Sequence, residues 1–528
     1  MSGRWLLLAG LSAALFAISN AALAQFDAKT TLFARCASCH ERTAEGGLSR
    51  ISEQRKTPEG WDMTIVRMML VHGVEITPEE RRVLVKYLAD TQGLAPQEAA
   101  PFRYILEREP AVFEDLPDEE LGIMCARCHS WARVGLQRRT ESEWLKLSHF
   151  HLGQWPTIEY QALARDRNWW EIASEQVPPK LAELFPLKSA AWDAWKNLPS
   201  PNLSGEWRFV GHEPGRGDFQ GVATLERAAT DNYAVQVSYT YDDGQNVRGT
   251  GEGTVYTGYE WRSRIRAGGD NTLQVFAVSR YGRRMEGRSF LEDADSIGSR
   301  VTAVRMDGVN EILAVMPAYL RAGESGEIAI HGVGLAGDVD LGEGLTVDEV
   351  VSADAMSVVV RVTAAADAPV GPHTVSVGDV SADGLFTVYQ QIDYVTVEPG
   401  YNIARVGGGG GPLPPVPAVF DAVAWLNGAD GEQGTDDDVR IGVVPASWAV
   451  DNFDDIAAEM QDAEYAGTMQ PTGVFLPAEA GPNQKRPFST NNAGNLKVIA
   501  TVKDGDREVQ GEGQLLVTVQ RWNDPPIR

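Results

Sequence analysis

Cysteine is scarce in this chain: its 528 residues include only four. Positive charge is also limited, because 47 lysines and arginines stand against 73 aspartates and glutamates, for a formal net charge of -26. So acidic a balance argues against binding nucleic acid or anionic lipid. After the N-terminus no stretch approaches about 20 apolar residues, so we expect no transmembrane helix. The second half also lacks a GxSxG motif and a nucleotide-binding loop.

The four cysteines all lie in one five-residue pattern, CxxCH, which occurs twice. It reads CASCH at residues 36–40 and CARCH at residues 125–129. Two thiols three positions apart on one helical turn can each add across a haem vinyl group, and the following histidine binds the iron. The pattern therefore predicts two covalently bound c-type haems. The attachment residues are Cys36, Cys39, Cys125 and Cys128, and the proximal iron ligands are His40 and His129.

Two other uses of paired cysteines fit the pattern less well. A structural zinc site needs a closed tetrahedral donor set, which the spacing of these histidines does not supply. A disulfide between cysteines three positions apart is strained in a helix. Redox CxxC motifs do not need the trailing histidine. Haem attachment accounts for all three residues of each motif.

The N-terminus is typical of an exported protein. An apolar run from Trp5 to about Ile18 follows Arg4 and leads to Ala-Leu-Ala, which ends at Ala24. The run is short for a bilayer span, and the small-x-small ending suits signal peptidase. We expect cleavage after Ala24 and a soluble periplasmic product, because bacteria attach haem covalently outside the inner membrane.

The first haem unit closes with a predicted amphipathic helix. Thr77 is a hydroxyl cap followed by proline, and Glu80 stands three residues after the cap. Apolar residues then recur at helical spacing, as expected of the closing helix of a small cytochrome c. The candidates for the sixth iron ligand lie between the haem motif and this helix. They are Met63, Met68, Met69 and His72, of which we favour Met68, with Met69 and His72 as alternatives.

The second unit offers histidine in place of methionine. When the units are aligned on Trp61 and Trp144, the position seven residues on is Met68 in the first and His151 in the second. We therefore expect His151, with His149 as the alternative, to give the second haem two histidine ligands. A thioether favours reduced iron and raises the potential relative to a second imidazole. Electrons are accordingly expected to pass from the second haem to the first.

From Asn202 onward, helical spacing gives way to strict alternation of apolar and polar residues. Alternation of apolar and polar residues at 235–241 and 259–266 is typical of an antiparallel sheet with one buried face and one solvent-exposed face. We predict an all-α dihaem cytochrome c domain followed by three all-β domains, namely one antiparallel barrel and two immunoglobulin-like sandwiches. The expected boundaries are a signal peptide at 1–24, the dihaem domain at 25–202 with units at 25–95 and 96–202, the barrel at 203–306, a sandwich at 307–397, a Gly/Pro-rich linker at 398–418 and a second sandwich at 419–528.

An acidic segment, Asp430 to Asp438, lies in the last predicted domain. Its carboxylates could hold calcium, but their spacing does not match an EF-hand loop. Runs of glycine and aspartate more often form solvated turns, which is the alternative interpretation.

The two CxxCH units, the segment from Trp144 to Gly153 and the three predicted β domains resemble the alpha subunit of quinohaemoprotein amine dehydrogenase. The GTDDD segment ending at Asp438 is a weaker point of likeness, and the resemblance covers essentially the whole chain. It implies a heterotrimer with a propeller-type beta subunit and a small gamma subunit that carries cysteine tryptophylquinone. In that family the quinone takes electrons from a primary amine, and the alpha subunit's haems relay them to azurin or a small cytochrome c.

The resemblance makes this chain the electron-transfer arm of an enzyme whose catalytic quinone lies on another chain. With all four cysteines used for haem, none is left for the thioether crosslinks of a tryptophylquinone. Two other classes of function stay open. A self-contained dihaem peroxidase would need an iron with an open or displaceable sixth position, and would react rapidly with peroxide. An exported β-sandwich binding protein would carry its haems as accessories.

Overall fold

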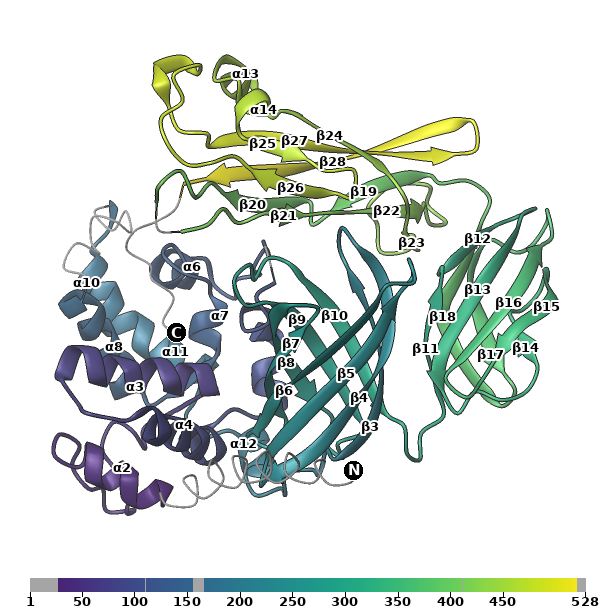
Figure 1. The fold of residues 1–528 in the computed structure, drawn as a ribbon. Helices are drawn as coiled ribbons and strands as arrows, with labels where there is room; N and C mark the ends of the chain where they lie inside the picture. Colours follow the sequence, from purple (N-terminus) through teal and green to yellow (C-terminus); the bar gives the residue numbers. More distant parts are fainter. Residues whose placement is uncertain (1–26, 110, 155–165, 412, 520–528) are drawn as a thin grey trace, which may run out of the picture.

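The computed structural model describes residues 27–109, 111–154, 166–411 and 413–519. Figure 1 shows a helical N-terminal region, a closed barrel beside it, two sheets on the far side of the barrel, and a C-terminal group of sheets across the top. No helix within these residues is long and apolar enough to cross a membrane. The expected signal peptide, residues 1–24, lies outside the described residues.

Hydroxyl caps begin the two long helices of the first haem unit. Thr57 and Thr77 each precede a helix that opens with proline, and Thr77 and Glu80 form the predicted reciprocal capping box. The helical elements of the N-terminal region are α2 (Ala28–Cys36), α3 (Pro58–His72), α4 (Pro78–Gln92), α5 (Pro96–Ala99), the 3-10 helix η1 (Ala100–Ile105), α6 (Glu119–Cys125), α7 (Ala132–Gly135), α8 (Glu141–Gln154), α10 (Trp169–Glu171), the π-helix η3 (Ile172–Gln176), α11 (Val177–Leu184) and α12 (Ala190–Trp195).

This region is not all-α, so the prediction of an all-α cytochrome domain is wrong. Two strands, β1 (Gln54–Lys56) and β2 (Gln137–Arg139), pair antiparallel, with Arg55 opposite Arg138. Three residues are too few to show alternation in sequence, and their charged side chains look like solvent-facing residues. Both arginines are nevertheless buried. The pair joins segments about 80 residues apart and leads directly into α3 and α8.

Eight antiparallel strands then close into a barrel, in the order β10-β3-β4-β5-β6-β7-β8-β9. A Cβ at Gly221 would lie 2.8 Å from the ring of Phe209, and one at Gly253 would lie 2.2 Å from the ring of Trp261. These glycines make room for aromatic rings, which fill the interior. The strands are β3 (Gly205–Glu213), β4 (Gly217–Ala229), β5 (Asn232–Tyr241), β6 (Asn246–Tyr256), β7 (Glu260–Ala267), β8 (Asp270–Val278), β9 (Arg284–Leu291) and β10 (Gly298–Arg305).

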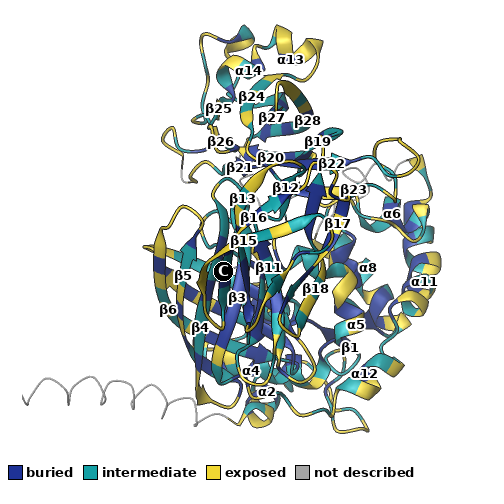
Figure 2. Ribbon diagram, turned by 90° about the vertical axis from the view of Figure 1, so that its right-hand side faces the viewer, coloured by how far each residue is buried: buried dark blue, intermediate teal, exposed yellow. Residues whose placement is uncertain are grey.

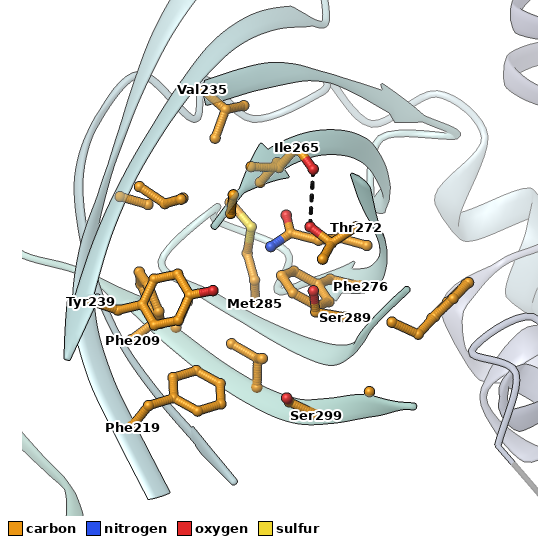
Figure 3. A pocket seen from close by; sticks show the side chains of 18 of the residues that line it. Phe209, Phe219, Val235, Tyr239, Ile265, Thr272, Phe276, Met285, Ser289 and Ser299 are labelled. Carbon is orange, nitrogen blue, oxygen red and sulfur yellow. Dashed lines mark hydrogen bonds between the residues drawn. The ribbon is translucent and has the colours of Figure 1, made fainter. Parts of the chain in front are cut away.

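A cavity of about 100 Å³ remains inside the barrel. Figure 3 shows Phe219, Tyr239 and Met285 among the side chains around it, with the hydroxyls of a few serines. The Thr272 hydroxyl donates to the carbonyl of Ile265 at 3.1 Å. Eight strands enclose an interior that side chains can nearly fill, so this space belongs to the barrel core.

The barrel packs against the N-terminal region. Leu94, Ala99 and Leu136 of that region belong to the same apolar cluster as the barrel's inward-facing residues. The indole of Trp195 donates to the carbonyl of Thr257 at 2.7 Å. Figure 2 shows buried residues on the barrel strands and on the elements beside them. The barrel thus supports one side of the helical region.

Two four-stranded sheets follow, in the orders β11-β13-β16-β15 and β12-β18-β17-β14. Ile328, Val360 and Phe386 are fully buried in the core shared by these sheets. The strands are β11 (Glu311–Met316), β12 (Tyr319–Arg321), β13 (Ser325–Val333), β14 (Val339–Asp340), β15 (Leu345–Ala353), β16 (Ser357–Ala364), β17 (Gly371–Val377) and β18 (Val380–Tyr389).

The C-terminal group has three sheets, in the orders β19-β22-β23, β20-β28-β27-β24 and β21-β26-β25. It is not all-β as predicted, because two short helices interrupt the strands; Asp454 caps the first through the amide of Ala457 (2.8 Å). Helices this short leave no periodic pattern in sequence. The elements are β19 (Tyr394–Glu398), β20 (Tyr401–Arg405), β21 (Ala418–Val419), β22 (Asp421–Leu426), β23 (Val439–Val443), β24 (Ser447–Asn452), α13 (Asp455–Glu459), α14 (Asp462–Tyr465), β25 (Gly467–Met469), β26 (Val474–Pro477), the 3-10 helix η4 (Pro487–Ser489), β27 (Gly494–Asp504) and β28 (Arg507–Thr518).

The acidic loop of this group uses its carboxylates to hold its own shape. Asp437 accepts a hydrogen bond from the amide of Ala429 (2.6 Å), and Asp438 accepts from the amide of Gly434 (2.7 Å) and the hydroxyl of Tyr394 (2.6 Å). These bonds are typical of a structured turn.

Candidate haem sites

The first CxxCH motif begins where α2 ends. Asp27 caps this helix by accepting a hydrogen bond from the amide of Thr30 (2.8 Å), and Cys36 is the last helical residue. The amide of His40 donates to the Cys36 carbonyl (3.0 Å), which turns the chain at the helix end. Nδ1 of His40 lies 2.8 Å from the carbonyl oxygen of Ser49. This contact leaves Nε2 as the ring nitrogen that can bind iron.

The second motif has the same construction. Asp118 caps α6 through the amide of Leu121 (2.9 Å), and the helix ends at Cys125. Nδ1 of His129 lies 2.9 Å from the carbonyl oxygen of Ser130. In both motifs a backbone carbonyl therefore orients the histidine and leaves Nε2 for a metal.

The four thiols are free, and neither motif contains a disulfide. Burial raises the pKa of Cys36 to about 11 and that of Cys125 to about 12, whereas Cys39 and Cys128 are exposed. Among the described residues, no group of three or more histidine, cysteine, aspartate or glutamate side chains could hold a metal ion. Each motif thus has two thiols that are not bridged to each other.

The histidine of the second motif faces a histidine of α8. The rings of His129 and His151 have centroids 6.5 Å apart and planes inclined by 36°. Nδ1 of His151 lies 2.7 Å from the carbonyl oxygen of Leu147, so its Nε2 is also left for a metal. A metal–imidazole bond is about 2.0–2.1 Å and a ring centroid lies about 1.1 Å from the bound nitrogen, so two axial imidazoles have centroids about 6.3 Å apart. The observed spacing fits one iron held by both rings.

The protonation states of the pair agree with this fit. Burial lowers the pKa of His129 and of His151, and the positive charge of Arg133 lowers both further. The lowered pKa values favour the neutral imidazole, which is the form that binds iron. The alternative ligand, His149, is exposed, and its ring packs edge-on against Trp170 with centroids 4.8 Å apart.

The sixth-ligand candidates of the first unit all lie on α3. Met69 and Cys36 pack against the same apolar cluster, whereas the Met63 sulfur accepts a hydrogen bond from Arg133 of the second unit (3.5 Å). His72 is exposed at the end of the helix. Within the part of the chain that the structure describes, no hydrogen bond or ring contact joins these residues to His40. The candidates are Met63, Met68, Met69 and His72.

An internal repeat relates the two units, and we did not predict its full extent. Residues 54–61 read QRKTPEGW and residues 137–144 read QRRTESEW. The first three residues of each form β1 and β2, the threonine precedes α3 or α8, and both tryptophans are fully buried. The helices are therefore equivalent, and so are the positions seven residues after each tryptophan.

A buried carboxylate joins the two units at this repeat. Glu98 binds Arg55 (2.8 Å) and Arg138 (3.2 Å), the two arginines that face each other across β1 and β2. Burial alone would raise the pKa of Glu98, but hydrogen bonds from Arg55 and the charges of both arginines outweigh it and hold the pKa at about 2. We call this group the Arg55–Glu98–Arg138 clasp. The two similar segments, QRK and QRR, were the sequence signal that could have revealed it.

Four family profiles match successive parts of the chain. All are described as belonging to the alpha subunit of quinohemoprotein amine dehydrogenase. They are the haem-binding domain at residues 26–192, domain II at 200–306, domain III at 309–390 and domain IV at 395–527. Together they span nearly the whole described chain.

Other comparisons give only distant likeness. No curated protein matches the chain. Among solved structures, a redesigned β barrel is 18% identical and covers 19% of this chain and 87% of its own, with a TM-score of 0.17. A glucan-utilisation protein of Bacteroides ovatus, SGBP-B, is 11% identical and covers 43% of this chain and 56% of its own, with a TM-score of 0.19. Likeness at this level says nothing about ligands or partners.

Proposed function

The chain belongs to the quinohemoprotein amine dehydrogenase alpha-subunit family, and on that basis we propose that it is the dihaem electron-transfer subunit of a periplasmic amine dehydrogenase. In this proposal it relays electrons from cysteine tryptophylquinone on a small gamma subunit, which oxidises primary amines, to azurin or a small cytochrome c. A propeller-type beta subunit completes the heterotrimer. Removal of residues 1–24 accompanies export.

Each haem would be held by thioether bonds to two cysteines and by two side chains that bind its iron. Bound haem supplies iron that takes up and gives up one electron at a time. The backbone carbonyls of Ser49, Ser130 and Leu147 fix the three histidine rings. The residues that would hold the first haem are Cys36, Cys39, His40 and Met68, and those that would hold the second are Cys125, Cys128, His129 and His151.

The facing pair of His129 and His151 is the observation that carries the proposal. Two half-buried imidazoles with lowered pKa values could both bind one iron at this spacing. A peroxidase would need an open position at its reacting iron, so the pair favours electron transfer at this site. The family match independently makes the region a haem-binding domain.

The proposal of Met68 rests on the internal repeat. Trp61 and Trp144 begin equivalent capped helices, α3 and α8, and His151 lies seven residues after Trp144. Seven residues are about two helical turns, so the same face is presented in both helices. Because His151 faces the proximal histidine of its unit, Met68 is the residue of α3 expected to face His40.

Haem content of the exported chain tests the proposal. We expect the purified protein to be red and to give two covalently bound haems per chain in a pyridine haemochrome assay. The haem should stay with the protein after acid–acetone extraction, because thioether bonds resist it. When the chain is copurified with its partner subunits, a primary amine should reduce both haems. A colourless chain, or porphyrin that extracts completely, would contradict the proposal.

A further inference from the structure

Positive side chains gather where the two haem units meet. Lys56 of β1 and Arg139 of β2 are buried, with 3% and 4% of their surfaces exposed. Arg67 of α3 is half-buried, and Arg133 of α7 is exposed beside them. We call these four residues the junction cations. Their concentration is notable in a chain whose formal net charge is -26.

The junction cations outnumber the carboxylates that could neutralise them. Glu143 is fully buried there, but Arg50 (3.3 Å) and Lys146 (2.7 Å) already bind it, and Arg139 approaches it only to 3.8 Å. Within the described residues, no carboxylate lies within 4.0 Å of Lys56, Arg67 or Arg133. Buried charges are normally paired, because removing them from water is costly. The junction therefore has unmatched positive charge.

Local contacts do not supply the missing anions. The Lys56 ammonium donates to the Thr64 hydroxyl (2.7 Å) and lies 5.1 Å from the Trp61 ring centroid. Burial, together with the positive charges of Arg139 and Arg67, holds the pKa of Lys56 well below its ordinary value. The hydrogen-bond and ring partners of Lys56 are thus neutral groups, so an anion bound at the junction would favour its charged form.

The junction cations lie against the second haem site. The Arg67 guanidinium carbon is 4.4 Å from the Phe150 ring centroid, and that ring is 6.0 Å from the ring of His151. The Arg133 guanidinium reaches from the second unit to the Met63 sulfur on α3 (3.5 Å). Each of these arginines therefore links α3 to the second unit: Arg67 of α3 contacts Phe150, and Arg133 contacts Met63 of α3.

We propose that Arg67 and Arg133 bind the propionate carboxylates of the second haem, with Lys56 and Arg139 as the buried positive charges behind them. This inference rests on the proposed function, since it assigns residues to a haem that the chain is proposed to hold. Haem carries two carboxylates, and guanidinium groups bind carboxylates with paired hydrogen bonds. The same charges would favour reduced iron, because reduction removes one positive charge from the site.

The experiment compares midpoint potentials of the purified two-haem chain and its variants. We expect Arg67→Gln and Arg133→Gln each to lower the potential of the second haem, so that the ratio of reduced to oxidised haem at a fixed potential falls about tenfold, or about 59 mV. Arg67→Lys keeps the charge and should retain most of the potential. Arg133 is exposed, so its variant tests the inference even where a change at Arg67 impairs folding.

Lys180→Gln is the matched control. It removes one positive charge from the same unit, but at a site where Asp118 (3.1 Å) and Glu120 (3.5 Å) already neutralise it. The midpoint potential of the second haem in Lys180→Gln should equal that in the unmodified chain. A second readout is the pH dependence of the haem potential. In the Gln variants, propionates that no longer bind an arginine should take up protons when the iron is reduced. The potential of these variants should therefore fall with rising pH between about pH 5 and pH 7.

The outcomes separate this inference from the proposed function. A chain without haem would overturn both. A chain with two haems whose second potential is unchanged in the Arg67 and Arg133 variants would overturn the inference alone. A shift of equal size in Lys180→Gln, or one without the pH dependence, would show a general effect of net charge and would also overturn it.

Discussion

The two CxxCH units share one framework and differ in the side chain at the position proposed for the sixth iron ligand. Each has a capped helix that ends at a CxxCH cysteine, a three-residue strand, a threonine and a tryptophan-anchored helix. In the second unit that helix places His151 opposite His129. In the first it places Met68 at the equivalent position. The comparison shows that one shared framework carries two different side chains, Met68 and His151, at equivalent helix positions, which are the positions proposed for the sixth iron ligands.

Removing the cysteines should have the largest effect and should separate the units. Cys125→Ala with Cys128→Ala is expected to leave one covalent haem, at the first motif. Cys36→Ala with Cys39→Ala should leave one haem at the second. The pyridine haemochrome assay should therefore give half the haem of the unmodified chain in each case. Two haems remaining in either double variant would show that the motif is not the attachment site.

Removing His151 should open the second iron without releasing its haem. His151→Ala is expected to bind carbon monoxide at one reduced haem per chain, because the sixth position becomes free, while haem content stays at two. His149→Ala is the control, since His149 is exposed and packs on Trp170. Its reduced spectrum should not respond to carbon monoxide. The opposite pattern would move the ligand to His149.

The Arg55–Glu98–Arg138 clasp should determine whether the units unfold together. Glu98→Gln leaves two buried arginines without a counter-charge, so we expect the free energy of unfolding at pH 7 to fall by about 3–5 kcal/mol. The control is Asp193→Asn. Asp193 is an exposed carboxylate on α12 that pairs with Lys196, so its substitution should change the free energy of unfolding little. Chemical denaturation, followed separately by haem absorbance and by tryptophan fluorescence, measures both variants.

The pH dependence of this effect has a definite sign. The pKa of Glu98 is about 2 in the folded protein, below its ordinary value of 4.5. Its contribution to stability is therefore present above about pH 4.5 and is lost as the pH falls toward 2. The difference between the unmodified chain and Glu98→Gln should shrink over that range. A difference that stays constant from pH 7 to pH 3 would show that the ion pairs do not account for it.

Exchanging the sixth ligand of the first unit should have the smallest effect and tests the comparison most closely. Met68→His would give both units two histidines, so the first haem's potential should fall toward that of the second by at least about 59 mV, a tenfold change in the reduced-to-oxidised ratio. Met69→Leu should leave the potential unchanged, because Met69 is expected to act only in packing. A drop with Met69→Leu and none with Met68→His would reverse the assignment of the ligand.

Local motifs were readable from the sequence, and long-range pairings were not. The CxxCH motifs and the Thr77 capping box involve residues within five positions, so their chemistry is visible in one stretch. Alignment on Trp61 and Trp144 gave the equivalence of Met68 and His151. The pairing of β1 with β2 and the clasp at Glu98 join residues tens of positions apart. Their arginines looked like surface residues, because charge alone does not reveal burial.

Low-temperature electron paramagnetic resonance of the oxidised, purified chain tests the central claim most directly. We expect two ferric signals of equal intensity, one of a bis-histidine haem and one of a histidine–methionine haem. His151→Ala should abolish only the first signal, and Met68→His should convert the second into a bis-histidine signal. Two identical signals in the unmodified chain, or none, would contradict the account.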